Sequence, residues 1–159
     1  MLSTPAAGQG AELPNLIEKV PPLSNGVYGL GVGLGAGDTT GLSFALRTES
    51  LLTVSSLVGW DFKDQEFHVH VDNQFPVAEI QPPESVLALT FFTGIGATVD
   101  LGDDAGIGAR IPLVASVSFD KPMEVFIELV PVVGVLPAIE LNMQATLGIR
   151  GWFQPTKKR

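Results

Sequence analysis

The sequence predicts an all-β chain, an eight-stranded antiparallel up-and-down transmembrane β-barrel, and three observations lead to this prediction. From Gly26 onward, large apolar residues recur at every second position, which is the period of a β-strand. Glycines occupy many of the positions in between. The charged residues of the expected strands fall on the glycine-bearing face, so the opposite face carries almost only aliphatic and aromatic side chains.

Composition narrows the class of protein. The chain has 159 residues, of which 45% are hydrophobic, yet no apolar run reaches the ~20 residues that a membrane helix needs. A β-barrel escapes this test because only alternate residues of its strands face lipid. The net charge of −8 argues against a nucleic acid as partner. The absence of cysteine removes disulfides, thiolate metal sites and cysteine nucleophiles.

The chain divides into three expected parts. Residues 1–25 form an irregular or disordered N-terminal arm, residues 26–153 form the barrel, and residues 154–159 form a polar, basic tail. The longest interruption within the barrel is Asn73–Ser85, which contains three prolines and is expected to be a link between strands. The expected strands are 27–36, 41–47, 51–62, 66–72, 86–101, 106–119, 123–130 and 141–153.

The first residues of the chain and the turns between the expected strands bear on where the protein is located. Residues 1–10 have neither the basic start nor the apolar core of a secretory signal. Because an outer-membrane protein must be exported, we expect a mature chain behind an added methionine, located in the bacterial outer membrane. The expected external turns are too short for a large adhesive surface; they are 37–40, 63–65, 102–105 and 133–140.

Alternation alone also fits a soluble barrel with an apolar interior, so the face that carries charge decides between the two. A soluble barrel would expose a surface of largely bare glycine, which weakens strands. In a narrow eight-stranded membrane barrel, the same glycines make room for the larger side chains that fill the lumen. A few residues do not fit their face: Ser56 on the apolar side, and Leu57, Phe92, Phe126, Val130 and Trp152 on the polar side.

The polar face predicts a lumen filled by paired charges. Buried charges must be paired, and arginine suits bidentate contacts with carboxylates. We expect a salt-bridged plug that blocks free flow of solutes, or a gated pore if the pairs can exchange partners. The predicted lumen network consists of Arg47, Asp61, His68, His70, Asp72, Asp100, Arg110, Glu124, Glu128, Gln144 and Arg150.

His68, His70 and Asp72 place three potential metal ligands on one strand face. Same-face residues repeat at ~7 Å along a strand, which is wider than a metal site usually needs. We therefore expect these side chains to fill the lumen, and we predict no metal and no cofactor. Enzyme activity is not expected either, because a lipid hydrolase needs a nucleophile beside a base and the outward Ser56 has no evident base.

The last expected strand resembles the C-terminal assembly signal of bacterial outer-membrane barrels. The resemblance rests on Thr146, Gly148 and the closing aromatic Phe153. It implies recognition by the barrel-insertion machinery. Gly151 departs from the pattern, where an apolar residue is usual, and so does the tail that follows Phe153.

Several segments together resemble a family of small, uncharacterised bacterial outer-membrane β-barrels of the OmpA/OmpX-like, eight-stranded type. The resemblance covers nearly everything from Val27 to Phe153 and implies a fold and a location. The family has no settled activity, so no mechanism follows from it. The segments are Gly29–Gly35, Gly59–Phe62, Phe67–His70, Gly106–Leu113, Glu124–Pro131 and Leu147–Arg150.

These patterns predict an integral outer-membrane β-barrel with a largely closed lumen, which acts as a structural or anchoring protein or as a very narrow, porin-like pore. Its expected partner is the lipid bilayer, and a protein partner, if there is one, should bind on the periplasmic side of the cell envelope. Two alternatives stay open. One is a soluble lipocalin-like β-barrel that binds an apolar ligand; the other is the barrel anchor of a larger envelope assembly.

Overall fold

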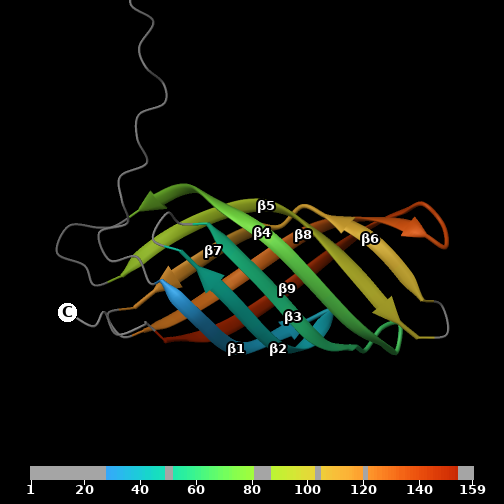
Figure 1. The fold of residues 1–159 in the computed structure, drawn as a ribbon, viewed down its shortest axis with the longest axis horizontal. Coiled ribbons are helices and arrows are strands. Elements are labelled where there is room, and N and C mark those ends of the chain that lie inside the picture. Colours follow the sequence, from blue (N-terminus) through green and yellow to red (C-terminus); the bar gives the residue numbers. More distant parts are fainter. Residues whose placement is uncertain (1–27, 49–51, 81–86, 103–104, 120–121, 154–159) are drawn as a thin grey trace, which may run out of the picture.

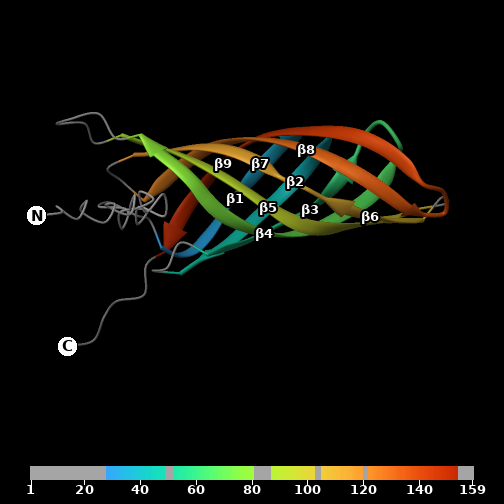
Figure 2. The same cartoon turned by 90° about the horizontal axis from the view of Figure 1, so that it is seen from above.

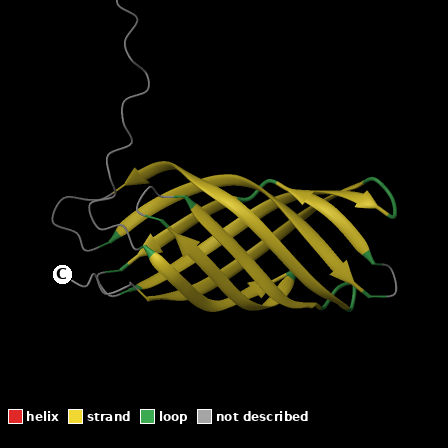
Figure 3. Cartoon of the chain, in the orientation of Figure 1, coloured by secondary structure: helices red, strands yellow, loops and turns green. Residues whose placement is uncertain are grey.

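The computed structural model describes residues 28–48, 52–80, 87–102, 105–119 and 122–153, which form strands and short turns (Figures 1 and 3). In these residues there is no helix of the length and apolarity that a membrane crossing demands. The strands are β1 (Gly29–Gly37), β2 (Thr39–Arg47), β3 (Thr53–Asp61), β4 (Glu66–Ile80), β5 (Ala88–Leu101), β6 (Gly106–Arg110), β7 (Leu113–Ser118), β8 (Met123–Leu136) and β9 (Glu140–Phe153).

All strand pairs are antiparallel, and the sheet closes on itself (Figures 1 and 2). β1 to β5 pair in sequence order, β8 pairs with β9, and β9 pairs with β1. β6 and β7 each lie between β5 and β8 and together take one place in the sheet. The prediction of an all-β, antiparallel sheet of eight strands is confirmed in this form, as one closed ring.

The strand expected at 106–119 is divided into β6 and β7 at Ile111 and Pro112. Proline has no backbone N–H and cannot donate to a neighbouring strand. Ile111 N still donates to the carbonyl oxygen of Pro131, at 3.1 Å, which keeps the two halves aligned with β8. The interruption is therefore local, and the chain continues in the same place of the ring.

Two expected loops were wrong, since strand pairing continues through them. β4 extends to Ile80, so the first part of the expected link Asn73–Ser85 pairs with β5, with a register shift between Pro76 and Ala78. Such a bulge tolerates a proline. Residues 81–85 of that link lie outside the described residues. β8 likewise continues to Leu136, which leaves three residues between it and β9.

The burial pattern is the reverse of that in an ordinary soluble domain. Among the described residues, nine hydrophobic residues are buried, whereas 33 large hydrophobic side chains are exposed. The 19 buried polar residues include charged side chains from β2, β3, β4, β6, β8 and β9. The polar face of the alternating pattern therefore lies inside the ring and the aliphatic face outside.

Gly148 lies on the inner face of β9, where a side chain has no room. A Cβ at this position would meet the ring of Phe126 and the carbonyl oxygen of Leu34. Gly148→Ala should therefore destabilise the fold by about 1–3 kcal/mol, the usual cost of overpacking.

Gly151 provides the matched control on the same strand. The atoms nearest to a Cβ there are 3.9 and 4.0 Å away, so Gly151→Ala should change the free energy of unfolding by no more than about 0.5 kcal/mol. Chemical denaturation of the two variants measures the difference. Equal unfolding midpoints would contradict the tight contact between Gly148 and Phe126.

Candidate functional site

The interior of the ring holds the polar side chains that the alternation assigns to one face. Nine of the predicted lumen residues are buried, and Asp100 and Gln144 are partly exposed. They come from strands far apart in the sequence. Closure of the ring brings β4 opposite β8 and β9, so their side chains share one interior (Figure 2). The buried nine are Arg47, Asp61, His68, His70, Asp72, Arg110, Glu124, Glu128 and Arg150.

Arg110 of β6 is the centre of a first ionic cluster. Its Nη2 donates to Glu128 Oε1 at 2.6 Å, and its Nε lies 3.1 Å from Asp72 Oδ1. Its Nη1 donates to His70 Nδ1 at 2.6 Å and to Gln144 Oε1 at 3.2 Å. One guanidinium thus joins side chains of β4, β8 and β9, which is the multiple contact that its planar fork allows.

Asp72 depends on Arg110 for compensation of its charge. Its side chain is fully buried, and neither carboxylate oxygen accepts a hydrogen bond from the described residues. A Cβ at the neighbouring Gly96 would collide with this carboxylate, so glycine is what leaves space for it. Burying an uncompensated carboxylate is very costly, which makes the Asp72–Arg110 ion pair essential to the cluster.

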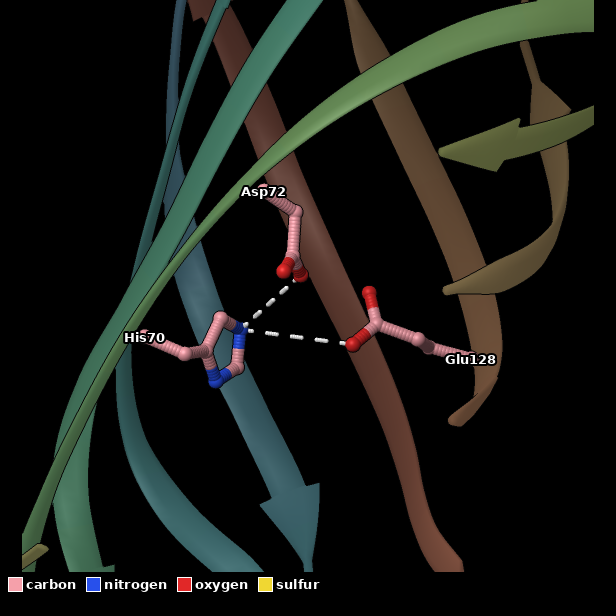
Figure 4. Close-up of side chains that lie close together, drawn as sticks. All are labelled: His70, Asp72 and Glu128. Atoms are coloured by element: carbon pink, nitrogen blue, oxygen red, sulfur yellow. Dashed lines mark ion pairs between the residues drawn. The ribbon is translucent and has the colours of Figure 1, made fainter. Parts of the chain in front are cut away.

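His70, Asp72 and Glu128 bring three potential ligand atoms within 4.8 Å of one another, and Figure 4 shows them converging. His70 Nε2 lies 3.7 Å from Asp72 Oδ2 and 4.0 Å from Glu128 Oε1. Pairing of distant strands brings Glu128 here, which spacing along β4 could not predict. Arg110 contacts all three residues, so a metal ion would have to share the site with a permanent cation. The arrangement fits the guanidinium better than a metal.

A second ionic cluster surrounds Arg47 of β2. Arg47 Nη2 donates to Glu124 Oε1 at 3.2 Å, and its Nε donates to Thr53 Oγ1 at 3.0 Å. The other Glu124 oxygen accepts from the indole of Trp152 at 2.7 Å. The guanidinium also lies over the rings of Trp152 and Phe92, 4.4 and 4.8 Å from their centroids. Ionic and cation–π contacts therefore act on the same arginine.

The third arginine, Arg150 of β9, combines a hydrogen bond to a hydroxyl group with a cation–π contact. Its Nε donates to Ser43 Oγ at 2.9 Å, and its guanidinium lies 3.9 Å from the centroid of Phe126. The five apolar residues that did not fit the polar face are all buried inside the ring. Three of them are the aromatic partners of Arg47 and Arg150, and the other two, Leu57 and Val130, fill space inside the ring.

Asp61 differs from the other predicted network members in the contacts it makes. Its Oδ1 accepts from the backbone N–H groups of Lys63 and Asp64, at 2.8 and 3.1 Å. It therefore caps the turn between β3 and β4. Sequence reasoning missed a different interior pair, in which Gln74 donates to Ser55 Oγ at 2.9 Å, because Gln74 falls within the expected proline-rich link.

His68 connects the Arg110 cluster to Asp100. Its Nδ1 lies 2.6 Å from Asp100 Oδ1, and its Nε2 lies 3.2 Å from His70 Nδ1. Thr98 Oγ1 is almost equidistant from the two ring nitrogens, at 3.4 and 3.3 Å, so it lines up with neither. The threonine hydroxyl is therefore not placed as a nucleophile whose proton the imidazole would take.

One end of the ring opens into an acidic cavity of about 420 Å³. Among the described residues that line it, there is no lysine and no arginine. Gln144 lines it too and accepts from Arg110, so the cavity ends at the first ionic cluster. Its carboxylates belong to Asp61, Asp64, Glu66, Asp100 and Glu140.

The residues of the expected assembly signal lie on β9, the strand that closes the ring. Thr146 and Gly148 are buried, Gly151 is half-buried, and Phe153 is exposed. β9 pairs with β1 on one side and with β8 on the other. A signal read from this strand would thus be read from the last strand to complete the sheet. Comparison of the chain with protein-family models, with curated proteins and with solved structures gives no match.

Proposed function

We propose that this chain is a transmembrane β-barrel of the bacterial outer membrane, with an interior closed by two ionic clusters, and that it acts as a structural or anchoring protein or as a very narrow pore. The observation that carries the proposal is the reversed burial pattern. Large hydrophobic side chains cover the outside of the closed ring. In the middle of the described strands, nearly all ionisable side chains lie inside the ring.

An apolar exterior of this extent favours lipid over water. Soluble monomers rarely expose contiguous apolar patches of more than a few hundred Å². Here the exposed hydrophobic residues occur on every strand of the ring, including Leu34 on β1, Val71 on β4 and Ile149 on β9. A closed sheet also satisfies its backbone hydrogen bonds internally, which the hydrocarbon core requires.

The strand lengths agree with a bilayer crossing. The three shortest full strands, β1, β2 and β3, have nine residues each, and the longest strands have 14 or 15. A tilted transmembrane strand needs about 9–11 residues. The extended ends of β8 and β9 form much of the wall of the acidic cavity, whereas the additional residues of β4, 75–80, pair with β5 at the opposite end of the ring.

The ionic clusters support a closed lumen over an open channel. Arg110 and the carboxylates paired with it lie at the inner end of the acidic cavity. Arg47 and Arg150 fill the interior together with aromatic rings. Eight-stranded rings have an interior just wide enough for side chains to fill. Passage of solutes would then require these ion pairs to separate.

The lipocalin-like alternative needs the apolar face to line the interior and hold an apolar ligand. In the described residues that face is outside, which speaks against it. The expected contacts with a periplasmic partner fall on the link Asn73–Ser85, the N-terminal arm and the tail, and only residues 73–80 of these segments are among the described residues.

The direct experiment compares the purified chain with and without detergent. A membrane barrel should be monodisperse only in detergent or lipid, and should migrate differently on a gel before and after boiling. Planar-bilayer recording then separates a plug from a pore, with the closed lumen predicting little or no conductance. A chain that stays monomeric in plain buffer would overturn the membrane proposal.

A further inference from the structure

At the end of the ring that holds the acidic cavity, β9 is longer than the strand beside it. The pairing of β1 with β9 ends at Gly37 and Thr146. Asp38 closes it, because its N–H donates to the carbonyl oxygen of Ala145 at 3.2 Å and its carboxylate accepts from the Ala145 N–H at 2.7 Å. On its other side, β9 stays paired with β8 as far as Glu140. The β8–β9 hairpin therefore reaches beyond the turn between β1 and β2 (Figures 1 and 2).

The backbone of β9 is consequently open on one side over residues 140–144. Alternate residues of a strand direct both their N–H and their C=O toward the same neighbouring strand. Ala145 directs both toward the β1–β2 turn, so Met143 and Leu141 direct theirs to the same side, where the described residues provide no backbone partner. Such a row of unpaired groups is a template for another strand in water, and it is costly in hydrocarbon.

The two faces of the open part of β9 differ in polarity. The outward side chains of Leu141 and Met143 are apolar and strongly exposed. The inward side chains of Glu140, Asn142 and Gln144 line the acidic cavity. Side chains that lie opposite one another in paired strands point to the same face of the sheet. A strand added beside β9 would therefore direct every second side chain into the cavity and the others to the apolar outside.

The charge of the cavity indicates which residues the added strand should direct into it. Five carboxylates line the cavity, and Lys63, which lies in the turn between β3 and β4, is not among the lining residues. These carboxylates do not converge as metal ligands do; in the described part of the chain, only His70, Asp72 and Glu128 bring three potential ligand atoms together. Carboxylates spread along a wall are complementary to several basic side chains rather than to one ion.

We propose that the open edge of β9 binds an extended segment of another protein in which lysine or arginine alternates with apolar residues. The segment adds a strand beside β9, with its basic side chains in the acidic cavity and its apolar side chains beside Leu141 and Met143. Backbone hydrogen bonds supply affinity in this mode of binding, and alternate side chains supply specificity. No segment of this chain has that alternation, since its nine lysines and arginines are either isolated or consecutive, so the partner is a different protein.

The proposed site lies at the end of the ring that carries the turn between β1 and β2 and the turn between β8 and β9. In the outer-membrane proposal this is the external end, opposite to the periplasmic side on which the sequence suggests a protein partner. The strand edge itself forms the site, so the site needs no long external loop. Its existence does not depend on the membrane proposal, because an open edge favours a partner in water as well as in lipid.

The test measures binding of a dye-labelled, eight-residue peptide of alternating lysine and valine to the full chain. The chain is folded in detergent, or in plain buffer if it proves soluble, so that failure of the membrane proposal does not affect the result. Saturable binding is expected, and added salt should weaken it by screening the charges. A peptide with glutamate in place of lysine should bind at least about ten-fold more weakly, because like charges repel. No saturable binding of the lysine peptide up to about 1 mM would overturn the proposal.

Methylation of the peptide backbone tests the addition of a strand. In an added strand, alternate N–H groups face β9 and the others face away from it. Two peptides, one methylated at the valine nitrogens and one at the lysine nitrogens, should therefore differ: one should lose binding and the other should keep it. Equal binding of the two would mean that charge alone attracts the peptide, which would overturn the proposal.

A change in the chain tests the edge itself. Met143→Pro removes an N–H that faces the open side, so the pairing with β8 stays intact, and proline is tolerated at such a position. It should weaken binding of the lysine peptide at least about five-fold. Met143→Ala keeps the N–H and should change the affinity less than about two-fold. Migration on a gel before and after boiling checks that both variants fold.

A second change tests the charge of the cavity, and two outcomes identify other occupants. Glu140→Gln should weaken binding of the lysine peptide by about two- to five-fold, the effect of one exposed ion pair. Binding that Met143→Pro leaves unchanged would indicate a site for small cations. A dimer of the chain that Met143→Pro converts to a monomer would indicate that a second copy occupies the edge. Either outcome would overturn the proposal.

Discussion

Arg110→Met should destabilise the folded chain by about 3–5 kcal/mol, the cost of breaking a buried ion pair by removal of one partner. The change leaves Asp72 and Glu128 buried without the arginine that pairs with both, and it also removes the donor to His70. Unfolding by denaturant in lipid vesicles, followed by the fraction that migrates as folded on an unboiled gel, measures the loss. Any conductance should rise in the same variant.

A compensating variant distinguishes lost charge balance from lost packing. In the Arg110→Met background, Asp72→Asn and Glu128→Gln remove the two carboxylates with little change of volume. Together they should recover a large part of the lost free energy, because neutral amides cost less to bury than unpaired carboxylates. If Arg110→Met alone is neutral, or if the added changes destabilise further, the ionic cluster does not have the role described here.

Ile127→Arg should destabilise the fold in a bilayer by about 2–4 kcal/mol, the cost of an arginine on the lipid face near the midplane. Ile127 lies on β8, is 49% exposed, and pairs with Ala115 on β7 and Leu147 on β9. On a surface in water, the same exposed substitution would be expected to stay within about 0.5 kcal/mol. Reversible unfolding from lipid vesicles gives the free energy.

Ile139→Arg is the matched control for Ile127→Arg. Ile139 is 84% exposed and lies in the turn between β8 and β9, beyond the strands. A residue beyond the strand ends should lie near the membrane surface, where an arginine should cost no more than about 1 kcal/mol. Equal effects of the two changes would mean that Ile127 does not face hydrocarbon.

The alternation of residues was enough to predict the faces and the ring. Leu30, Val32 and Leu34 alternate with glycines in β1, and the same period places Arg47 and Arg150 on the inner face. The rule also explains the apparent misfits: Phe92 and Trp152 have the parity of the polar face and lie inside, where arginines need aromatic partners.

The ion pairs inside the ring could not be predicted from the sequence. They depend on which residues face one another once the sheet has closed, and this is set by the register of all the strands. Glu128 meets Arg110 and Glu124 meets Arg47 through strand pairings that no local pattern encodes. The extension of β4 was missed for a different reason. Pro76 indicates a break in an isolated strand, but a bulge beside β5 accommodates it.

The two tryptophans allow the most direct test of the central claim, that the outside of the ring meets lipid. Trp60 is 44% exposed on β3, and Trp152 is 3% exposed inside the ring. Trp152→Phe leaves Trp60 as the one fluorophore of this kind, and Trp60→Phe leaves Trp152. In vesicles of lipids with brominated acyl chains, Trp60 should be strongly quenched and Trp152 only weakly. Trp60 fluorescence that is quenched by iodide in water and not by brominated lipid would contradict the account.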